Sequence, residues 1–384
     1  MQHEVRERVM AEIEEYLASA TTAMAPEVMK NPVAEYVDPA RLAQELDLLR
    51  TVPIIVGHAA RCAEPGDFFT EDAAGAPVLV VRQQDGSLKA FLNVCRHRGA
   101  KVELDDCGRR GGFTCPYHAW SYRLDGSLRK VSYDDCFGDP GDAASGLVEL
   151  AVAERHGFVW VVLTPGAEID VASYLGGLDE ELASFGLDGY VVERDTLLKA
   201  DLNWKIVVDG FLETYHIKFL HTRTIGPYIR TNLTPFEAFG PHGRMVGVRD
   251  SYDEVLGKSA EEADCMPHIA IIYQLFPNTV LVWQADHFEI WLIFPEGERP
   301  DRSTARVMLL APHPTRDDAE QRIWDLNWKI LMQTVLEEDF PVGETMQRAF
   351  GSGAQEHLTF GRNEPALQHF HRSLADALGP LPSA

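Results

Sequence analysis

The chain has few cysteines and no long apolar run. Its 384 residues include six cysteines, too few to hold a chain of this length together by disulfides. No stretch approaches the roughly 20 apolar residues that a membrane-spanning helix requires, and residues 1–16 are charged where a secretion signal would be apolar. We therefore expect reduced thiols and a cytoplasmic protein that does not enter a membrane.

Basic residues are also in the minority. The 35 lysines and arginines face 59 acidic residues, which gives a formal net charge of −24. Such a field repels a nucleic-acid backbone or an anionic lipid surface, so we expect neither as a partner. A negative surface suits a basic protein partner or serves only to keep the chain soluble.

Length and composition favour a globular protein of two large domains. Apolar residues make up 45% of the chain and charged residues 24%, as in ordinary folded proteins, and domains average roughly 150 residues. Residues 1–51 predict short helices, interrupted by prolines, that pack on the later domain. We place a small all-β domain at 52–166 and a second domain at 167–384.

Turn signals support the all-β assignment. The dipeptide Asp85-Gly86 separates the β-rich runs 77–82 and 88–94, and Asp125-Gly126 stands in the same setting. A dipeptide of this kind between two short β-rich runs predicts a hairpin with a type I′ turn.

The second domain combines β-rich runs with a long helix. Four β-rich runs between residues 269 and 312 predict an antiparallel meander. Residues 317–350 predict a long helix that begins near Asp317, and residues 204–221 have apolar residues at helical spacing. The predicted fold class is α+β, with a curved antiparallel sheet around the long C-terminal helix in a helix-grip arrangement.

Two cysteine–histidine pairs form the first candidate metal site. Cys95 and His97 are followed by Cys115 and His118 in the pattern C-x-H-x17-C-x-x-H, and both pairs come directly after strands, so their loops can face each other. Four-coordinate zinc uses the same ligand types. The mixed order favours a [2Fe–2S] cluster, because it lets the two thiolates bind one iron and the two imidazoles the other.

Two histidines and a downstream acidic run form the second candidate site. His216 and His221 lie five residues apart, which rotates them by roughly 140° on a regular α-helix, so joint ligation needs a π-bulge or an unwound turn. Taken alone, the pair reads better as two unrelated histidines on a partly buried helix. The acidic run at 337–347 lies on the predicted long helix, where a carboxylate can complete a two-histidine, one-carboxylate Fe(II) site with positions open for dioxygen and substrate.

Together these motifs resemble the Rieske non-haem iron oxygenases, the α-subunit family of ring-hydroxylating oxygenases. Besides the cysteine–histidine pairs, the resemblance rests on E-x-Y-H-x-x-x-x-H, which ends at His221, and on E-D-x-x-x-x-E-x-x-Q, which ends at Gln347. It spans residues 40–372. It implies two sets of ligands: for the cluster, Cys95, His97, Cys115 and His118; for the mononuclear iron, His216, His221 and Asp339.

The choice of Asp339 also follows from the resemblance. Three other acids lie on the same predicted helix, at Asp325, Glu337 and Glu338. Only Asp339 has the family's offset to the later Glu and Gln of the motif.

Two acids upstream of the histidines have expected roles in electron transfer. Glu213 lies three residues before His216, on the same predicted helix face, and can hold the second nitrogen of that imidazole. In the family an acid here, more often Asp, links the mononuclear site to the cluster of a neighbouring subunit, which implies a homotrimer. Asp209 either orients this path or is a solvated or helix-capping acid.

Pocket candidates come from elements expected to surround the iron. They are Phe211, Phe219, Tyr273, Leu275, Trp283, Gln284, His287 and Trp291. Alternation turns only about half of any strand inward. Aromatic walls can hold an aromatic ring or, by cation–π attraction, a quaternary ammonium ion. The long Glu213 side chain resembles the carnitine and glycine betaine monooxygenase-like subgroup, which favours the second.

The resemblance implies a terminal oxygenase that hydroxylates, dihydroxylates or oxidatively demethylates a small organic substrate with dioxygen. Its electrons come from a reductase or ferredoxin, so NAD(P)H acts only indirectly. The sequence leaves open the substrate, the number of oxygen atoms inserted, the donor protein and a β-subunit. The alternatives are a Rieske electron carrier whose second domain only docks partners, and a zinc-binding module.

Overall fold

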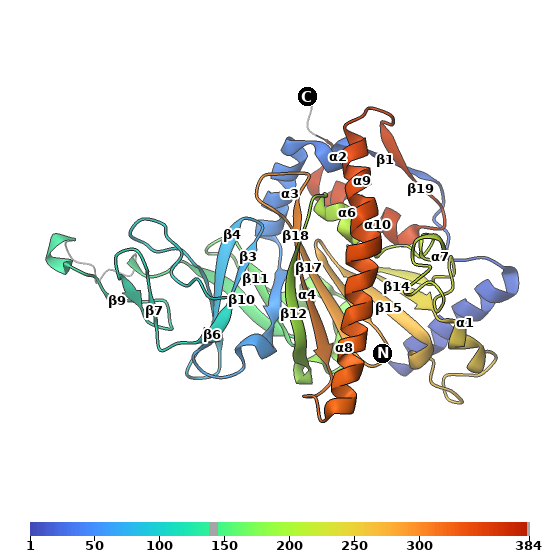
Figure 1. Cartoon of the computed structure of the whole chain (residues 1–384), viewed down its shortest axis with the longest axis horizontal. Coiled ribbons are helices and arrows are strands. Elements are labelled where there is room, and N and C mark those ends of the chain that lie inside the picture. Colours follow the sequence, from blue (N-terminus) through green and yellow to red (C-terminus); the bar gives the residue numbers. More distant parts are fainter. Residues whose placement is uncertain (138–144, 382–384) are drawn as a thin grey trace. The chain divides into compact units, whose positions relative to one another are not determined.

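The fold is taken from a computed structural model, which describes residues 1–137 and 145–381 (Figure 1). The chain divides into two compact units: Leu46–Tyr174, and Met1–Glu45 together with Leu175–Ala384. The predicted domains 52–166 and 167–384 include residues 138–144 and 382–384, which lie outside the described part.

The smaller unit is built from antiparallel strands. A seven-stranded sheet has the order β2-β11-β10-β5-β4-β3-β6, and a three-stranded sheet has the order β7-β8-β9. The strands are β2 (Ile54–His58), β3 (Asp67–Ala73), β4 (Ala76–Arg82), β5 (Leu88–Leu92), β6 (Cys107–Arg109), β7 (Phe113–Thr114), β8 (Ser121–Tyr122), β9 (Leu128–Lys130), β10 (Glu149–Arg155) and β11 (Phe158–Val162). Short 3-10 turns, η1 (Ala59–Cys62) and η2 (Asp134–Cys136), complete it. The all-β prediction is confirmed for this unit.

The two predicted hairpins form, but their turn type was wrong. Gly86 has φ +85°, whereas Asp85 does not have a positive φ, and a type I′ turn needs a positive φ at both central residues. The Gly86 N–H donates to the Gln83 carbonyl, and the Gln83 N–H donates to the Ser87 carbonyl. These bonds make a type I turn followed by a left-handed glycine, a longer hairpin loop.

The larger unit contains a second seven-stranded antiparallel sheet, with the order β12-β18-β17-β16-β15-β14-β13. Its strands are β12 (Val191–Ala200), β13 (Phe236–Phe239), β14 (His242–Val248), β15 (Ile269–Leu275), β16 (Thr279–Trp283), β17 (Phe288–Pro295) and β18 (Ser303–Ala311). Every residue of β14, β15 and β17 is buried, so both faces of the sheet centre are covered. The predicted meander corresponds to β15–β18.

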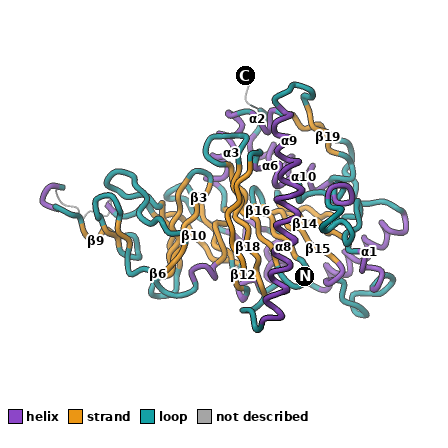
Figure 2. The backbone as a smooth tube through the Cα atoms, in the orientation of Figure 1, coloured by secondary structure: helices purple, strands orange, loops and turns teal. Residues whose placement is uncertain are grey.

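A long helical rod lies along this sheet (Figure 2). It consists of α8 (Asp318–Gln333), a π-helical segment η7 (Thr334–Asp339) and α9 (Phe340–Phe350). The Asp317 carboxylate accepts hydrogen bonds from the N–H groups of Ala319 and Glu320 and so caps the start of the rod. The predicted long helix is therefore confirmed, with a wider turn inside it.

The remaining helices are shorter than the rod. They are α1 (His3–Ser19), α2 (Ala34–Val37), α3 (Pro39–Thr51), α4 (Val171–Leu175), α5 (Leu178–Ala183), α6 (Trp204–Asp209), α7 (Ile217–Leu220) and α10 (Pro365–Leu378), with 3-10 turns η4 (Leu187–Gly189), η5 (Asp250–Glu254) and η6 (Met266–His268). In the described part of the chain, no helix combines the length and apolarity that a bilayer crossing needs. The helical spacing at 204–221 does not give one helix, since residues 210–216 are not helical.

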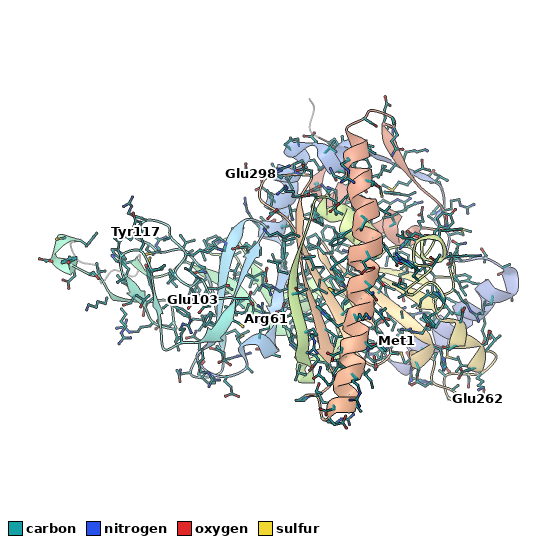
Figure 3. All side chains as sticks on the ribbon, in the orientation of Figure 1. Met1, Arg61, Glu103, Tyr117, Glu262 and Glu298 are labelled. Atoms are coloured by element: carbon teal, nitrogen blue, oxygen red, sulfur yellow. The ribbon has the colours of Figure 1, made fainter. Side chains whose placement is uncertain are left out.

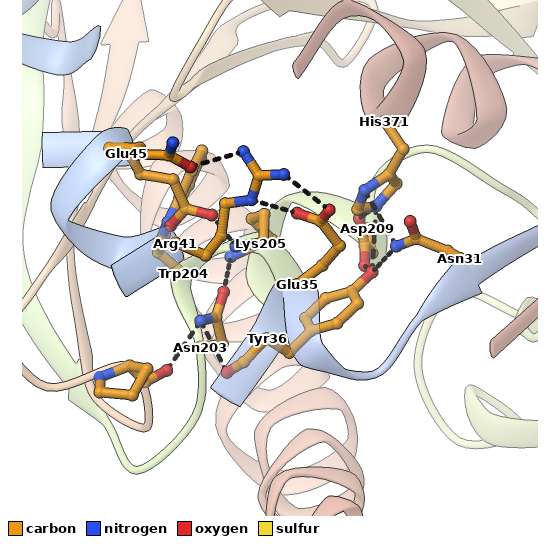
Figure 4. Close-up of polar contacts among 12 residues, drawn as sticks. Asn31, Glu35, Tyr36, Arg41, Glu45, Asn203, Trp204, Lys205, Asp209 and His371 are labelled. Carbon is orange, nitrogen blue, oxygen red and sulfur yellow. Dashed lines mark hydrogen bonds and ion pairs between the residues drawn. The ribbon is translucent and has the colours of Figure 1, made fainter. Parts of the chain in front are cut away.

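The N-terminal residues are tied into the larger unit by paired strands and buried polar contacts. Strand β1 (Met29–Pro32) pairs with β19 (His357–Phe360). Glu45 binds the Lys205 ammonium group, and both side chains are 1% exposed; Glu45 also accepts a 2.7 Å hydrogen bond from the Trp204 indole. The Asn203 side chain, which caps α6, donates to the Tyr36 carbonyl (Figure 4). The start of α6 is thereby fixed by residues near the N-terminus of the chain.

Candidate functional site

Two loops of the smaller unit carry the first metal motif on matching backbone frames. The Cys95 N–H donates to the carbonyl five residues later, and the Cys115 N–H does the same. Each cysteine carbonyl accepts from the N–H four residues on, at Gly99 and Ala119. Both of these residues have a positive φ, of +79° and +57°. The two loops therefore present a cysteine and a histidine in the same way.

The ligand atoms gather as a sulfur pair and a nitrogen pair. The Nδ1 atoms of His97 and His118 lie 3.0 Å apart. Burial raises the pKa of the Cys115 thiol, and the adjacent Cys95 thiol raises it further. Around a single zinc all four ligand atoms would crowd together, but among the described residues the quartet does not form such a group. Separate pairs fit a two-iron cluster with one iron held by each.

Aromatic side chains surround the two loops. The His97 ring stacks on Trp120 with centroids 5.1 Å apart, and His118 stacks on Tyr117 at 3.8 Å. Tyr117 is 56% exposed at the surface of the smaller unit (Figure 3). The Tyr122 hydroxyl lies 3.3 Å from the Cys95 sulfur. The cysteines are thus buried, while the histidine side of the site approaches solvent.

The second motif converges in the larger unit. The Nε2 atoms of His216 and His221 lie 3.1 Å apart, and Asp339 Oδ1 lies 3.8 Å and 3.2 Å from them. Among the described residues, only these three form a group of potential metal ligands within 4.8 Å. Two imidazoles and one carboxylate on one side of a point are the ligand set of a non-haem Fe(II) site with open positions. The donor set therefore fits a mononuclear iron.

A carboxylate holds the far nitrogen of each imidazole. Glu213 binds Nδ1 of His216 through one oxygen and accepts from the His216 N–H at 3.1 Å through the other. Glu338 Oε2 lies 2.8 Å from Nδ1 of His221 and also accepts from the Thr224 hydroxyl at 2.6 Å. Such contacts fix the tautomer, so that both Nε2 atoms are free to bind a metal.

The contact between Glu213 and His216 was predicted, but the reason for it was wrong. Neither residue is inside a helix: α6 ends at Asp209, and His216 is the residue before α7. His221 directly follows the one-turn helix α7. The segment between the histidines is nevertheless helical, because the Leu220 N–H donates to the His216 carbonyl and the His221 N–H donates to the Ile217 carbonyl. The unwound turn expected between them was wrong, and the two imidazoles meet where α7 ends.

Sequence reasoning treated Glu338 only as a rival ligand. In the wider turn of η7, consecutive residues Glu338 and Asp339 both reach His221, one at Nδ1 and the other at Nε2. A π-helical turn is therefore present in the carboxylate's helix, and not between the two histidines, where the sequence suggested one. The role of Glu338 beside His221 could have been predicted only if the sequence had indicated a π-helical turn in the acidic run.

The same carboxylates change the acidity of the histidine. Burial lowers the pKa of His221, but hydrogen bonds and charges from Asp339 and Glu338 outweigh it and raise the pKa above its ordinary value. Because a metal binds only the neutral imidazole, metal binding at His221 competes with protonation of the ring.

A cavity of about 270 Å³ opens beside the three ligands. Its walls come from β14–β17, the loop 210–229 and one face of the helical rod. Of the predicted pocket residues, Phe211, Gln284 and His287 line it.

The other predicted pocket residues lie elsewhere. Phe219 is 68% exposed. Tyr273 and Trp283 point to the opposite sheet face, where Tyr273 donates to Glu181 and Trp283 packs on Phe288. Leu275 shares the side of β15 with Tyr273, and Trp291 is fully buried behind Phe211, with ring centroids 5.1 Å apart. The cavity is less aromatic than expected.

Asp209 is bound within the larger unit and does not line the cavity. Its carboxylate accepts a 2.7 Å hydrogen bond from the Tyr36 hydroxyl and lies 2.8 Å from Nε2 of His371 (Figure 4). Asn31 completes this buried cluster through Nδ1 of His371. Asp209 is therefore neither a solvated acid nor, within the described residues, a contact of Glu213.

A paired cysteine–histidine centre in one unit and a two-histidine, one-carboxylate centre in the other define a Rieske-type non-haem iron protein. Comparison with known families agrees: residues 53–145 match the Rieske [2Fe-2S] domain, and residues 187–379, half of the chain, match the catalytic domain of the ring hydroxylating alpha subunit. The chain belongs to this family. Its cofactors are accordingly a Rieske cluster and a mononuclear iron, and neither a zinc module nor a simple electron carrier is supported.

Relatives lie in two branches. The chain is 32% identical over 200 residues to the oxygenase subunit of glycine betaine monooxygenase from Chromohalobacter salexigens, covering 52% of this chain and 44% of that one. It is 30% identical over 280 residues to the large oxygenase component of naphthalene 1,2-dioxygenase from Pseudomonas putida, covering 62% of each. The chain thus spans about half to two thirds of these relatives' length.

A solved structure shares the fold over nearly the whole chain. A quaternary ammonium Rieske monooxygenase in complex with L-carnitine superposes with a TM-score of 0.77 at 21% identity, covering 95% of this chain and 98% of that one. This likeness concerns the fold and leaves the substrate open.

Proposed function

We propose that this chain is the terminal oxygenase component of a multi-component system. It uses dioxygen and electrons from a reductase or ferredoxin to hydroxylate, dihydroxylate or oxidatively demethylate a small organic molecule. The main observation in favour of this function is that His216, His221 and Asp339 lie together at the wall of a cavity. A merely structural metal has its coordination closed by the protein, whereas this site faces space for a ligand.

The proposed roles follow from the contacts. When bound, the cluster supplies single electrons and the Fe(II) activates dioxygen. Cys95 and Cys115 hold one cluster iron, and His97 and His118 hold the other. At the second site, Glu213 and Glu338 keep the Nδ1 protons of the two histidines away from the metal. Aliphatic side chains on the cavity wall limit the access of water.

Glu213 is a positioning residue that also links two subunits in this proposal. One of its oxygens holds His216 Nδ1, and its side chain remains 14% exposed. A neighbouring subunit's cluster histidine can therefore reach the carboxylate in a homotrimer. Asp209 is hydrogen-bonded to Tyr36 and lies against His371. It supports the end of α6 and takes no direct part in electron transfer.

Chain mixing tests this inter-subunit path. One population carries His97→Ala, which removes a cluster ligand, and the other carries His216→Ala, which removes a ligand of the mononuclear iron. Each alone is expected to be inactive, whereas co-assembled trimers regain part of the turnover because electrons cross between chains. Mixtures that stay inactive while sedimenting as trimers would contradict the path.

Iron analysis tests the proposed function itself. After anaerobic reconstitution with Fe(II), the wild type is expected to hold about three irons per chain and His216→Ala about two, with unchanged cluster absorbance. The control is His313→Ala, an exposed histidine of the same unit. A panel of aromatic acids and methylammonium compounds with labelled dioxygen then identifies product. Two irons in every variant, with no label incorporated, would refute the oxygenase.

The proposed setting is the cytoplasm, where a reductase can pass electrons from NAD(P)H. The net charge of −24 favours a donor with a basic docking face. Such docking weakens as salt screens the charges, so turnover at limiting donor is expected to fall with ionic strength.

A further inference from the structure

The cavity has a metal end and a polar end. Six residues on one face of the helical rod line it, in the order Asn327, Ile330, Leu331, Thr334, Val335 and Asp339. Asn327 and Asp339 are the limits of this row. These limits are twelve residues apart, about 18 Å along a helix axis. Asn327 lies at the polar end, because its amide is 3.4 Å from Nδ1 of His287. The side chains between the two ends are mainly apolar. A molecule held at the polar end therefore reaches the metal ligands only along this apolar middle part of the cavity.

Arg249 is the cation of the polar end. It directly follows β14, and its guanidinium donates to the Gln284 side chain at 2.8 Å and to the Ile269 carbonyl at 3.4 Å. These bonds use two of its five N–H groups. In the described part of the chain, no carboxylate forms an ion pair with it.

The surroundings of Arg249 disfavour its positive charge. Burial lowers the pKa of Arg249, while Asp286 and Glu289 raise it to a smaller degree. Arginine nevertheless stays charged in proteins, and Arg249 is half-buried with no carboxylate in contact within the described residues. An anionic ligand supplies the missing partner.

The two nearby acids are already engaged. Asp286 lies 2.6 Å from Nδ1 of His287, and Glu289 lies 3.6 Å from its Nε2. Burial lowers the pKa of His287, but these two acids raise it to about 9. The imidazolium is therefore charged at neutral pH and offsets one of the two acids. Within the described residues neither acid forms an ion pair with Arg249, so its remaining N–H groups can bind a ligand.

The rest of the lining is mainly aliphatic. Branched residues such as Ile217, Ile272 and Val282 line the walls. Apart from histidines, the only aromatic side chains among the described lining residues are Phe211 and Tyr228. Tyr228 is 63% exposed. A quaternary ammonium cage needs several converging aromatic faces, and this cavity does not provide them.

We infer that Arg249, with Gln284 beside it, is a carboxylate-binding site that selects an amphiphilic organic acid as substrate. The substrate's carboxylate lies at the polar end, and its hydrocarbon chain fills the apolar middle part of the cavity. The carbon that is oxidised lies far from the carboxylate, next to His216, His221 and Asp339. As an assignment of substrate, this inference rests on the proposed function. Arg249 is a specificity-determining residue in it.

Binding of a matched pair of probes tests the inference without turnover. Decanoate and decanamide share one chain and differ in charge, so their affinities for the iron-loaded protein under argon, measured by calorimetry, isolate the carboxylate. Decanoate is expected to bind tenfold or more tightly, because hydrogen bonds to charged groups are the stronger kind. Arg249→Gln removes the preference. The control Arg230→Gln, an arginine engaged with Asp250 and Asp253, keeps it.

The outcomes separate this inference from the proposed function. Equal affinities in the wild type overturn the inference even if Arg249→Gln does not fold, and so does a preference that survives in folded Arg249→Gln. Tighter binding of γ-butyrobetaine than of decanoate, unaffected by the substitution, also overturns it. None of these results alters the iron count or the incorporation of labelled oxygen. Conversely, a two-iron protein that prefers decanoate retains the Arg249 site and loses the oxygenase.

Discussion

Nδ1 of His221 lies 2.8 Å from Oε2 of Glu338. Both side chains are almost inaccessible, at 2% and 5% exposed, and the next residue, Asp339, faces the opposite nitrogen of the same ring. A single π-helical turn therefore supplies both a carboxylate of the candidate metal site and the carboxylate that holds one of its histidines.

Glu338→Gln is expected to weaken iron binding by about tenfold, and Glu338→Ala by up to about a hundredfold, as for other partners of ligating histidines. Gln still accepts a hydrogen bond but carries no charge. Iron content at graded Fe(II) measures the effect, with the exposed neighbour in Glu337→Gln as control. Equal affinity in all three variants would show that Glu338 does not orient the ring.

Tyr122→Phe is expected to lower the reduction potential of the cluster. The hydroxyl lies 3.3 Å from the Cys95 sulfur, and a hydrogen bond to a cluster sulfur stabilises the reduced, more negative state. One hydrogen bond corresponds to a decrease on the order of 50 mV for one electron. Redox titration followed by the paramagnetic signal measures it. Tyr133→Phe, at an 82% exposed position of the same unit, is expected to leave the potential unchanged.

Glu45→Gln is expected to destabilise the larger unit by about 3–5 kcal/mol, because it leaves the Lys205 charge buried without its partner. Chemical denaturation followed by tryptophan fluorescence reports this. The surface pair of Lys199 and Glu296 provides the contrast: Lys199 is 66% exposed, so Glu296→Gln is expected to cost at most about 1 kcal/mol. Similar losses in both variants would mean that burial does not determine the cost.

Stability is expected to fall as the pH rises from about 7 through 9. Burial lowers and the neighbouring acids raise the pKa of His287, to about 9 in the folded chain, against about 6.5 when unfolded. A raised pKa gives stability that is complete below the unfolded value and is lost as the pH passes the folded one. The loss is on the order of 3 kcal/mol. His287→Gln should flatten this part of the curve; an unchanged curve would assign the dependence to other groups.

The two candidate ligand sets could be predicted because each depends mainly on short spacings along the sequence. Cys95 and His97 and the run from Glu213 to His221 need only a few consecutive residues. Glu338 was missed, since a π turn leaves no mark in an acidic run where three carboxylates follow one another.

The pocket was harder to predict for a reason of packing. On β15 the cavity is lined by Ala270 and Ile272, whereas prediction chose Tyr273 and Leu275, one residue out of phase. A strand buried on both faces has no polar side, so its alternation does not tell which face borders the cavity. Arg249 lies just past a strand end and carried no motif at all.

Residues at three positions along the helical rod contact three different parts of the larger unit. Asn327 borders the polar end, Asp339 the metal, and Gln347 accepts from the Asn203 N–H at 3.0 Å. Inserting or deleting one residue in the rod would rotate all later residues of the helix by about 100°. A change of this kind would therefore disturb the later contacts together and could not shift one of them by itself. New substrate preferences in such a scaffold must arise through side-chain replacement on a rod of constant length, while the surface loops around it are free to grow.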